Sequence, residues 1–114
     1  METNKLEDTL HSIINNVSTL DWVVDFYLYG STAQGRRHVD SDVDLLILGT
    51  KPKTLETLVE LSKLLSYTPI EIDVKYSTID DYNKQKNTNK FYLNIQKDLR
   101  KVDDVLNELL SFRS

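Results

Sequence analysis

Two aspartates separated by one residue, Asp42 and Asp44, stand at the start of an apolar run that is typical of a β-strand. Residues i and i+2 of a strand project from the same face, about 6.6 Å apart at the backbone, so both carboxylates can reach one divalent cation or bracket two. An Asp-x-Asp pair is also expected by chance in a chain with 12 aspartates. Its position is more informative, because residues 45–48 are all apolar and an unpaired carboxylate beside them would be costly.

A third aspartate, Asp73, lies in a segment that alternates strictly between apolar and polar residues from Ile70 to Tyr76. Alternation predicts a strand with one polar face, and Asp73 lies on that face. A neighbouring strand is about 4.8 Å away, so Asp73 can complete an oxygen-rich site with Asp42 and Asp44. Hard oxygen ligands suit Mg²⁺ or Mn²⁺ rather than zinc.

Gly30 and Ser31 follow directly after an apolar and aromatic segment. Glycine lets a backbone approach a phosphate closely, and free N–H groups with the Ser31 hydroxyl can hold phosphate oxygens. Arg36 and Arg37 are either loop cations or phosphate contacts, and Lys75 is either an ion-pair partner or a triphosphate contact. The sequence leaves these interpretations open.

The elements around these residues form an alternating series. An amphipathic helix is expected over residues 6–20, because its apolar positions recur at spacings of three and four. The predicted elements that follow are a strand (23–29), a strand (43–48), a helix (55–65) and a strand (70–76). The fold class is therefore α/β of the α+β kind, a small mixed β-sheet flanked by helices.

The last third of the chain is harder to assign. Residues 77–90 are mostly polar and predict a loop with one helical turn, which Thr78 and Asp81 would cap. A helical period begins at Phe91 and continues to the C-terminal region, with a short edge strand over residues 98–102 as the alternative.

Composition limits the kinds of protein that the chain can be. Its 114 residues predict one domain over 1–114, and no apolar run is long enough to cross a membrane. The net charge of -4 argues against strong nucleic-acid binding. There is no cysteine and no secretory signal, which is compatible with the cytoplasmic location that we expect.

The chain resembles the DNA polymerase beta-like nucleotidyltransferases in two stretches, YGSTAQG at 29–35 and SDVDLLI at 41–47, and in the spacing to Asp73. More narrowly, it resembles the minimal nucleotidyltransferases that are often encoded beside a helical HEPN partner as toxin–antitoxin pairs. Gln34 stands where many relatives have arginine.

This resemblance implies the nucleotidyltransferase fold and a metal-dependent reaction. A nucleoside monophosphate would pass from a nucleoside triphosphate, most simply ATP, to a hydroxyl group, with release of pyrophosphate. The resemblance assigns Gly30 and Ser31 to the triphosphate, and Asp42 and Asp44 to both metals. It assigns Asp73 to the catalytic metal and to deprotonation of the acceptor. The implied cofactor is Mg²⁺, with Mn²⁺ as the substitute.

The acceptor is the part on which the sequence leaves alternatives open. Larger relatives have an added helical domain that shapes the nucleobase pocket, and 114 residues leave no room for one. We therefore expect a second copy or another protein to close the site. The prediction is an antitoxin that transfers AMP to a protein hydroxyl, such as a tyrosine of a HEPN-type toxin. The alternatives are transfer to a small molecule such as an aminoglycoside, and a nucleotide-binding antitoxin that acts by contact alone.

Overall fold

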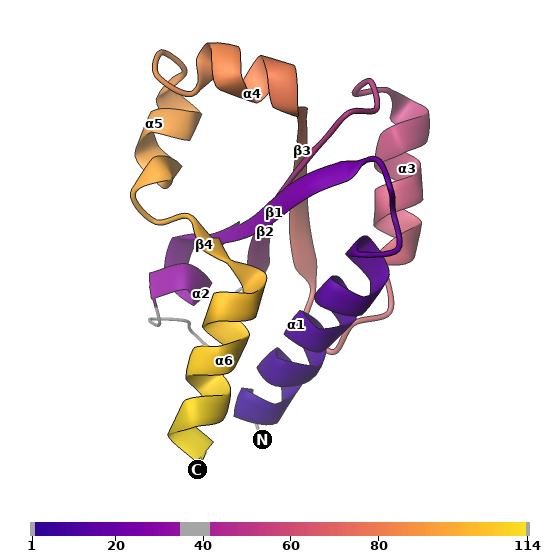
Figure 1. Cartoon of the computed structure of the whole chain (residues 1–114). Helices are drawn as coiled ribbons and strands as arrows, with labels where there is room; N and C mark the ends of the chain where they lie inside the picture. Colours follow the sequence, from indigo (N-terminus) through magenta and orange to yellow (C-terminus); the bar gives the residue numbers. More distant parts are fainter. Residues whose placement is uncertain (1, 35–41, 114) are drawn as a thin grey trace.

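The computed structural model describes residues 2–34 and 42–113 (Figure 1). Four strands form one mixed sheet in the order β3-β2-β1-β4. β1 is antiparallel to both of its neighbours, β2 and β4, whereas β2 and β3 are parallel. The strands are β1 (Val23–Tyr29), β2 (Val43–Gly49), β3 (Ile72–Thr78) and β4 (Arg100–Lys101).

Six helices accompany the sheet in the part of the chain that the structure describes. They are α1 (Glu2–Val17), α2 (Gly30–Gln34), α3 (Leu55–Leu64), α4 (Ile79–Gln85), α5 (Lys90–Gln96) and α6 (Val102–Arg113). The expected small mixed sheet with flanking helices is confirmed. None of the described helices is long and apolar enough to cross a membrane.

The main hydrophobic core lies between one face of the sheet and α1, α3 and α6. Alternate residues of β2 point into it, and Val43, Leu45 and Ile47 have no exposed surface. The helices contribute their apolar stripes, from which Leu10 and Ile13 of α1 are also fully buried. This face is the one that the amphipathic patterns of the sequence predict.

A smaller core lies on the opposite face, beneath α4 and α5. Its buried members are Tyr29 of β1, Leu46 and Leu48 of β2, and Ile95 of α5. Asp44 belongs to the same set of alternate residues on β2, so it points to this second face at the end of the smaller core.

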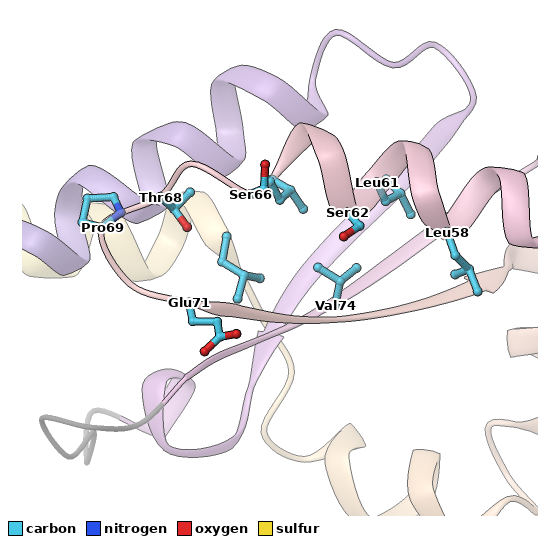
Figure 2. Close-up of a pocket in the computed structure, with 10 residues that line it drawn as sticks. Leu58, Leu61, Ser62, Ser66, Thr68, Pro69, Glu71 and Val74 are labelled. Atoms are coloured by element: carbon cyan, nitrogen blue, oxygen red, sulfur yellow. The ribbon is translucent and has the colours of Figure 1, made fainter.

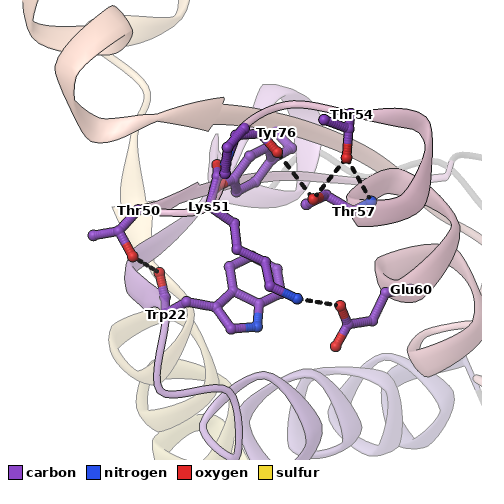
Figure 3. A network of polar contacts seen from close by, with 8 residues as sticks. Trp22, Thr50, Lys51, Thr54, Thr57, Glu60 and Tyr76 are labelled. Atoms are coloured by element: carbon purple, nitrogen blue, oxygen red, sulfur yellow. Dashed lines mark hydrogen bonds and ion pairs between the residues drawn. The ribbon is translucent and has the colours of Figure 1, made fainter.

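The link from β2 to α3 is fixed by contacts around Trp22 (Figure 3). Trp22 packs edge-on against Tyr76 with 5.8 Å between ring centroids, and Lys51 lies over its ring at 4.9 Å. Lys51 also pairs with Glu60 of α3 at 2.9 Å, and the Tyr76 hydroxyl donates to the Lys51 carbonyl at 2.6 Å. These contacts hold the edge strand β3 against the start of α3.

The outer edge of β1 is paired over a short length. β4 aligns with Tyr27 and Leu28 of β1, and the β1–β2 register shifts between Val23 and Asp25 as in a β-bulge. Asp25 accepts a hydrogen bond from the Tyr27 hydroxyl at 2.9 Å and lies 3.6 Å from Lys101 Nζ. Burial and the bond to Asp25 raise the pKa of Tyr27 to about 12.

Besides shifts of the predicted helix over 6–20 to Glu2–Val17 and of the predicted strand end from 76 to Thr78, three sequence-based assignments were wrong. Residues 79–85 form a helix rather than a loop with one turn, although the predicted cap at Thr78 is correct, since its hydroxyl accepts from the Asp81 N–H. The third strand begins at Ile72, not Ile70, because the Ile70 N–H donates to the Thr9 hydroxyl instead of a strand.

The third assignment concerns the predicted helix from Phe91 onward. It is divided into α5 and α6 by the edge strand β4, which confirms the alternative of a short strand in this region. The division has a packing cause: Leu99 packs in the smaller core and Val102 in the main core. The chain therefore crosses from one face of the sheet to the other at β4.

Candidate functional site

The register of β2 and β3 places two of the predicted site residues side by side. Asp44 and Asp73 are direct partners across the parallel ladder, which begins where the Val43 N–H donates to the Glu71 carbonyl at 2.9 Å. Partners on adjacent strands point to the same face, so both carboxylates lie on the face that carries the smaller core. Two residues distant in the sequence thus form one acidic position.

The electrostatic environment of Asp44 combines burial with neighbouring negative charge. Burial raises the pKa of Asp44, and the charges of Asp73 and Asp42 raise it further, while Lys75 opposes them. Tyr29 is the partner of Asp44 on the other side, in β1, and its pKa is raised by burial and by the charges of Asp44 and Asp73. The site is therefore short of positive charge, a condition that a bound cation would relieve.

Gly30 is fitted against this acidic position. It is the first residue of α2 and has a φ of 72°, a conformation that favours glycine. A methyl group at this position would lie 2.6 Å from Oδ2 of Asp44. The glycine is needed both for the turn after β1 and for the space in which the Asp44 carboxylate lies.

The other predicted ligands are arranged less closely. Asp42 is exposed and precedes β2 by one residue. Among the residues that the structure describes, no three acidic or histidine side chains form a group that could hold a metal ion. The three carboxylates that we expected to form one centre are therefore not close together as a group. Asp44 and Asp73 are paired across the β2–β3 ladder, and Asp42 lies two residues before Asp44.

The start of α2 supplies hydroxyl groups beside the acidic pair. Ser31 is half-buried, and the side chain of Thr32 is buried with no hydrogen-bond partner for its Oγ1 within the described residues. α2 is held from the other edge of the sheet, where Arg100 donates to the Ala33 carbonyl at 3.4 Å and pairs with Glu108 at 2.7 Å.

The three cationic residues that the sequence offers as phosphate contacts are only partly described by the structure. Lys75 Nζ lies 4.0 Å from Asp73 Oδ1 with both side chains about half exposed, which agrees with the ion-pair interpretation. Arg36 and Arg37 lie outside the described residues, as does Gly35 of the first stretch.

Sequence reasoning missed an aromatic group beside the acidic pair. Tyr29 packs edge-on against Phe91 of α5 at 5.7 Å between centroids, Phe91 against Tyr92 at 5.5 Å, and Tyr92 against Tyr82 of α4 at 5.2 Å. The aromatic residues of 82–92 were the available signal, but no local pattern places them next to β1.

A cavity of about 700 Å³ lies elsewhere, between α3 and β3 (Figure 2). Ile72 and Val74 of β3 line it, together with Leu58 and Leu61 of α3. Because β-strand side chains alternate, Asp73 between them points to the other face of the sheet. The cavity and the acidic pair are thus on opposite faces.

Comparisons with known proteins identify the family and the fold. The model of the family described as "Nucleotidyltransferase domain" matches residues 10–109. A crystal structure from Sulfolobus solfataricus, provisionally named as a nucleotidyltransferase, is similar with a TM-score of 0.50 and 18% sequence identity. The similarity covers 73% of this chain and 75% of that chain, and at this identity it shows the fold alone. No curated protein matches the sequence.

Proposed function

The chain belongs to the nucleotidyltransferase domain family, and from this membership we propose that it transfers a nucleoside monophosphate from ATP to a hydroxyl group on a protein. The alignment of Asp44 with Asp73, with Gly30 fitted against Asp44, is the observation that supports the proposal most directly. It brings two carboxylates and a closely approaching backbone together where β1 ends and β2 and β3 begin. Transfer from a polyphosphate needs both of these features.

The donor set fits a divalent cation of the Mg²⁺ or Mn²⁺ class. Asp44 and Asp73 offer hard carboxylate oxygens, and the pKa of Asp44 is raised by burial and by the charges of Asp73 and Asp42, which a cation would offset. Asp42 is the proposed third ligand. When bound, the metal supplies charge stabilisation at the phosphate oxygens.

The remaining roles belong to residues of the chain. Gly30 and Ser31 bind the triphosphate through backbone N–H groups and the Ser31 hydroxyl. Asp73 takes the proton of the acceptor hydroxyl while the oxygen of that hydroxyl attacks the α-phosphorus of the triphosphate. The bond from that phosphorus to the bridging oxygen of the β-phosphate breaks, and pyrophosphate leaves with the electron pair.

A protein acceptor suits the exposure of the site. The Asp73 side chain is 47% exposed and Asp42 is exposed, so a group presented by another molecule can reach them. We propose that the acceptor is a tyrosine of a HEPN-type toxin, that the transferred group is AMP, and that the chain acts as the antitoxin. Transfer would then silence the toxin.

The test is transfer of label from α-labelled ATP with Mg²⁺ to a co-expressed HEPN-type protein, with pyrophosphate release measured in parallel. Asp73→Asn should abolish labelling while ATP affinity falls less severely, because a positioned base contributes about 10²–10⁴-fold. Glu71→Gln is the matched control, an exposed carboxylate two residues away that has no role in the proposal.

Other outcomes identify the competing functions. Label on an aminoglycoside with none on protein would replace the protein acceptor by a small molecule. Full neutralisation of the toxin by Asp73→Asn would show that contact alone is the mechanism. Absence of both ATP binding and pyrophosphate release would contradict the proposed function as a whole.

A further inference from the structure

Phe91, near the start of α5, is the most exposed member of the aromatic group that it forms with Tyr29, Tyr82 and Tyr92. It is 39% exposed, although it contacts Tyr29, of which only 7% is exposed. Burying an aromatic side chain is favourable. An exposed ring near a proposed site therefore indicates a surface that a ligand can cover, whereas an isolated surface leucine does not.

The side chain of Tyr29 lies between the Phe91 ring and the acidic pair of Asp44 and Asp73. Tyr29 is the strand partner of Asp44, and the charges of Asp44 and Asp73 act on its hydroxyl. Phe91 packs on the same Tyr29 with 5.7 Å between ring centroids. A nucleotide whose phosphates lie at Asp44 extends its ribose and base outward from them, and Phe91 is the exposed ring within that neighbourhood.

The geometry of the aromatic contacts leaves the faces of the Phe91 ring without a stacked neighbour. Its planes with Tyr29 and Tyr92 make angles of 89° and 66°, so both are edge contacts rather than parallel stacks. Within the described residues no aromatic ring lies parallel to that of Phe91. These edge contacts hold the ring in position, and the 39% of Phe91 that is exposed is the surface on which a planar group would stack.

Two lysines supply positive charge next to Phe91 and Asp73. Lys90 precedes Phe91 and is exposed, and Lys75 lies on the same face of the sheet as Asp73. Asn89 caps α5 by accepting from the Phe91 and Tyr92 N–H groups, which fixes the backbone on which Phe91 stands.

From these contacts we infer that Phe91 is the stacking platform for the nucleobase of the nucleoside triphosphate, and that α5 sets the preference for large bases. The inference rests on the proposed function, since it takes the phosphates to be held at Asp44. It assigns to α5 a direct part in recognising the nucleotide, beyond covering the smaller core.

The test compares two ligands that differ in the base. Binding of ATP and of inorganic tripolyphosphate is measured with Mg²⁺ for the wild type, Phe91→Ala, Phe91→Trp and Leu93→Ala. Phe91→Ala should weaken ATP binding roughly tenfold and leave tripolyphosphate binding unchanged, because base stacking is lost and phosphate contacts are not. Phe91→Trp should retain ATP affinity, and the wild type should bind ATP more tightly than UTP, a preference that Phe91→Ala loses.

Leu93 is the matched control, an exposed apolar residue of the same helix at 47% exposure. Its replacement should change neither affinity. An equal loss of ATP and tripolyphosphate binding in Phe91→Ala would show a structural role through Tyr29 and overturn the inference. Unchanged ATP affinity in Phe91→Ala would overturn it as well, even if transfer to the acceptor is lost. A wild type that binds neither ligand contradicts the proposed function itself.

Discussion

The two faces of the sheet differ in how completely they are covered. On one face, α1, α3 and α6 bury Val43, Leu45 and Ile47 of β2 without any exposed surface. On the other face, α4 and α5 cover Leu46 and Leu48, and the cover stops short of Asp44 and Asp73. A single strand thus contributes both to the main core and to the acidic pair, through residues that are neighbours in sequence.

This difference separates stability from activity. Removing apolar groups from the closed face should reduce the free energy of unfolding, whereas neutralising the acidic pair should reduce catalysis with little effect on the fold. Asp44 and Leu45 are adjacent and point in opposite directions, so they offer the sharpest comparison.

Asp44→Asn is expected to have the largest effect. Transfer should fall by at least about 100-fold, because the variant removes a proposed ligand of the metal that would stabilise phosphate charge. The free energy of unfolding should stay the same or rise, since the repulsion from Asp73 and Asp42 disappears. Label transfer and urea denaturation measure the two quantities. Transfer at the wild-type rate would contradict the assignment of Asp44.

Leu45→Ala should have the opposite pattern. The free energy of unfolding should fall by about 2–5 kcal/mol, as for other large-to-small changes at fully buried positions. ATP affinity of the molecules that remain folded should be unchanged. Denaturant titration gives the first quantity and calorimetric binding at low temperature gives the second; a strong loss of affinity in folded protein would mean that the two faces are coupled.

Gly30→Ala is expected to affect both quantities to a smaller extent. The left-handed conformation costs an alanine about 1–2 kcal/mol, and the new methyl group would push Oδ2 of Asp44 out of its place. Gly49→Ala is the control, because its methyl group would meet the Trp22 carbonyl at 2.7 Å, away from the acidic pair. Both variants should be destabilised, and Gly30→Ala alone should lose triphosphate affinity.

The pH dependence of stability should show the smallest effect. Asp44 binds its proton more tightly in the folded state, so its contribution favours folding at low pH and is lost as pH rises above its ordinary pKa of 3.8. The stability of Asp44→Asn relative to the wild type should therefore increase from pH 3.5 upward in metal-free buffer. Urea midpoints across this range give the result; parallel curves for the two proteins would mean that Asp44 titrates normally.

The sequence predicted the parts of the fold whose signals are local. The β-branched and aromatic run that stops at Gly30 predicted β1 with its observed boundaries, and the apolar run after Asp44 predicted β2. The alternation around Asp73 predicted its face correctly. The ladder that makes Asp44 and Asp73 direct partners joins strands separated by α3, so their register depends on packing that no short pattern contains.

The segment from 79 to 90 was predicted as a loop for a related reason, whereas the helical period from Phe91 matches α5. α4 is short and largely polar and α5 is short, and they are stabilised by packing on the sheet rather than by a strong helical pattern: Ile79 and Tyr82 are partly buried there and Ile95 is buried. The contact of Phe91 with Tyr29 depends on that docking. The aromatic part of the candidate site therefore becomes visible only when the tertiary structure is known.

The short pairing of β4 with β1 has a consequence for solubility. An open strand edge is a template for intermolecular pairing and aggregation, and most of the outer edge of β1 has no strand partner among the residues described. Val24 is 53% exposed there, so the edge is apolar in part. The bulge before Asp25 and the charges of Asp25 and Lys101 interrupt the edge and make it a poor template.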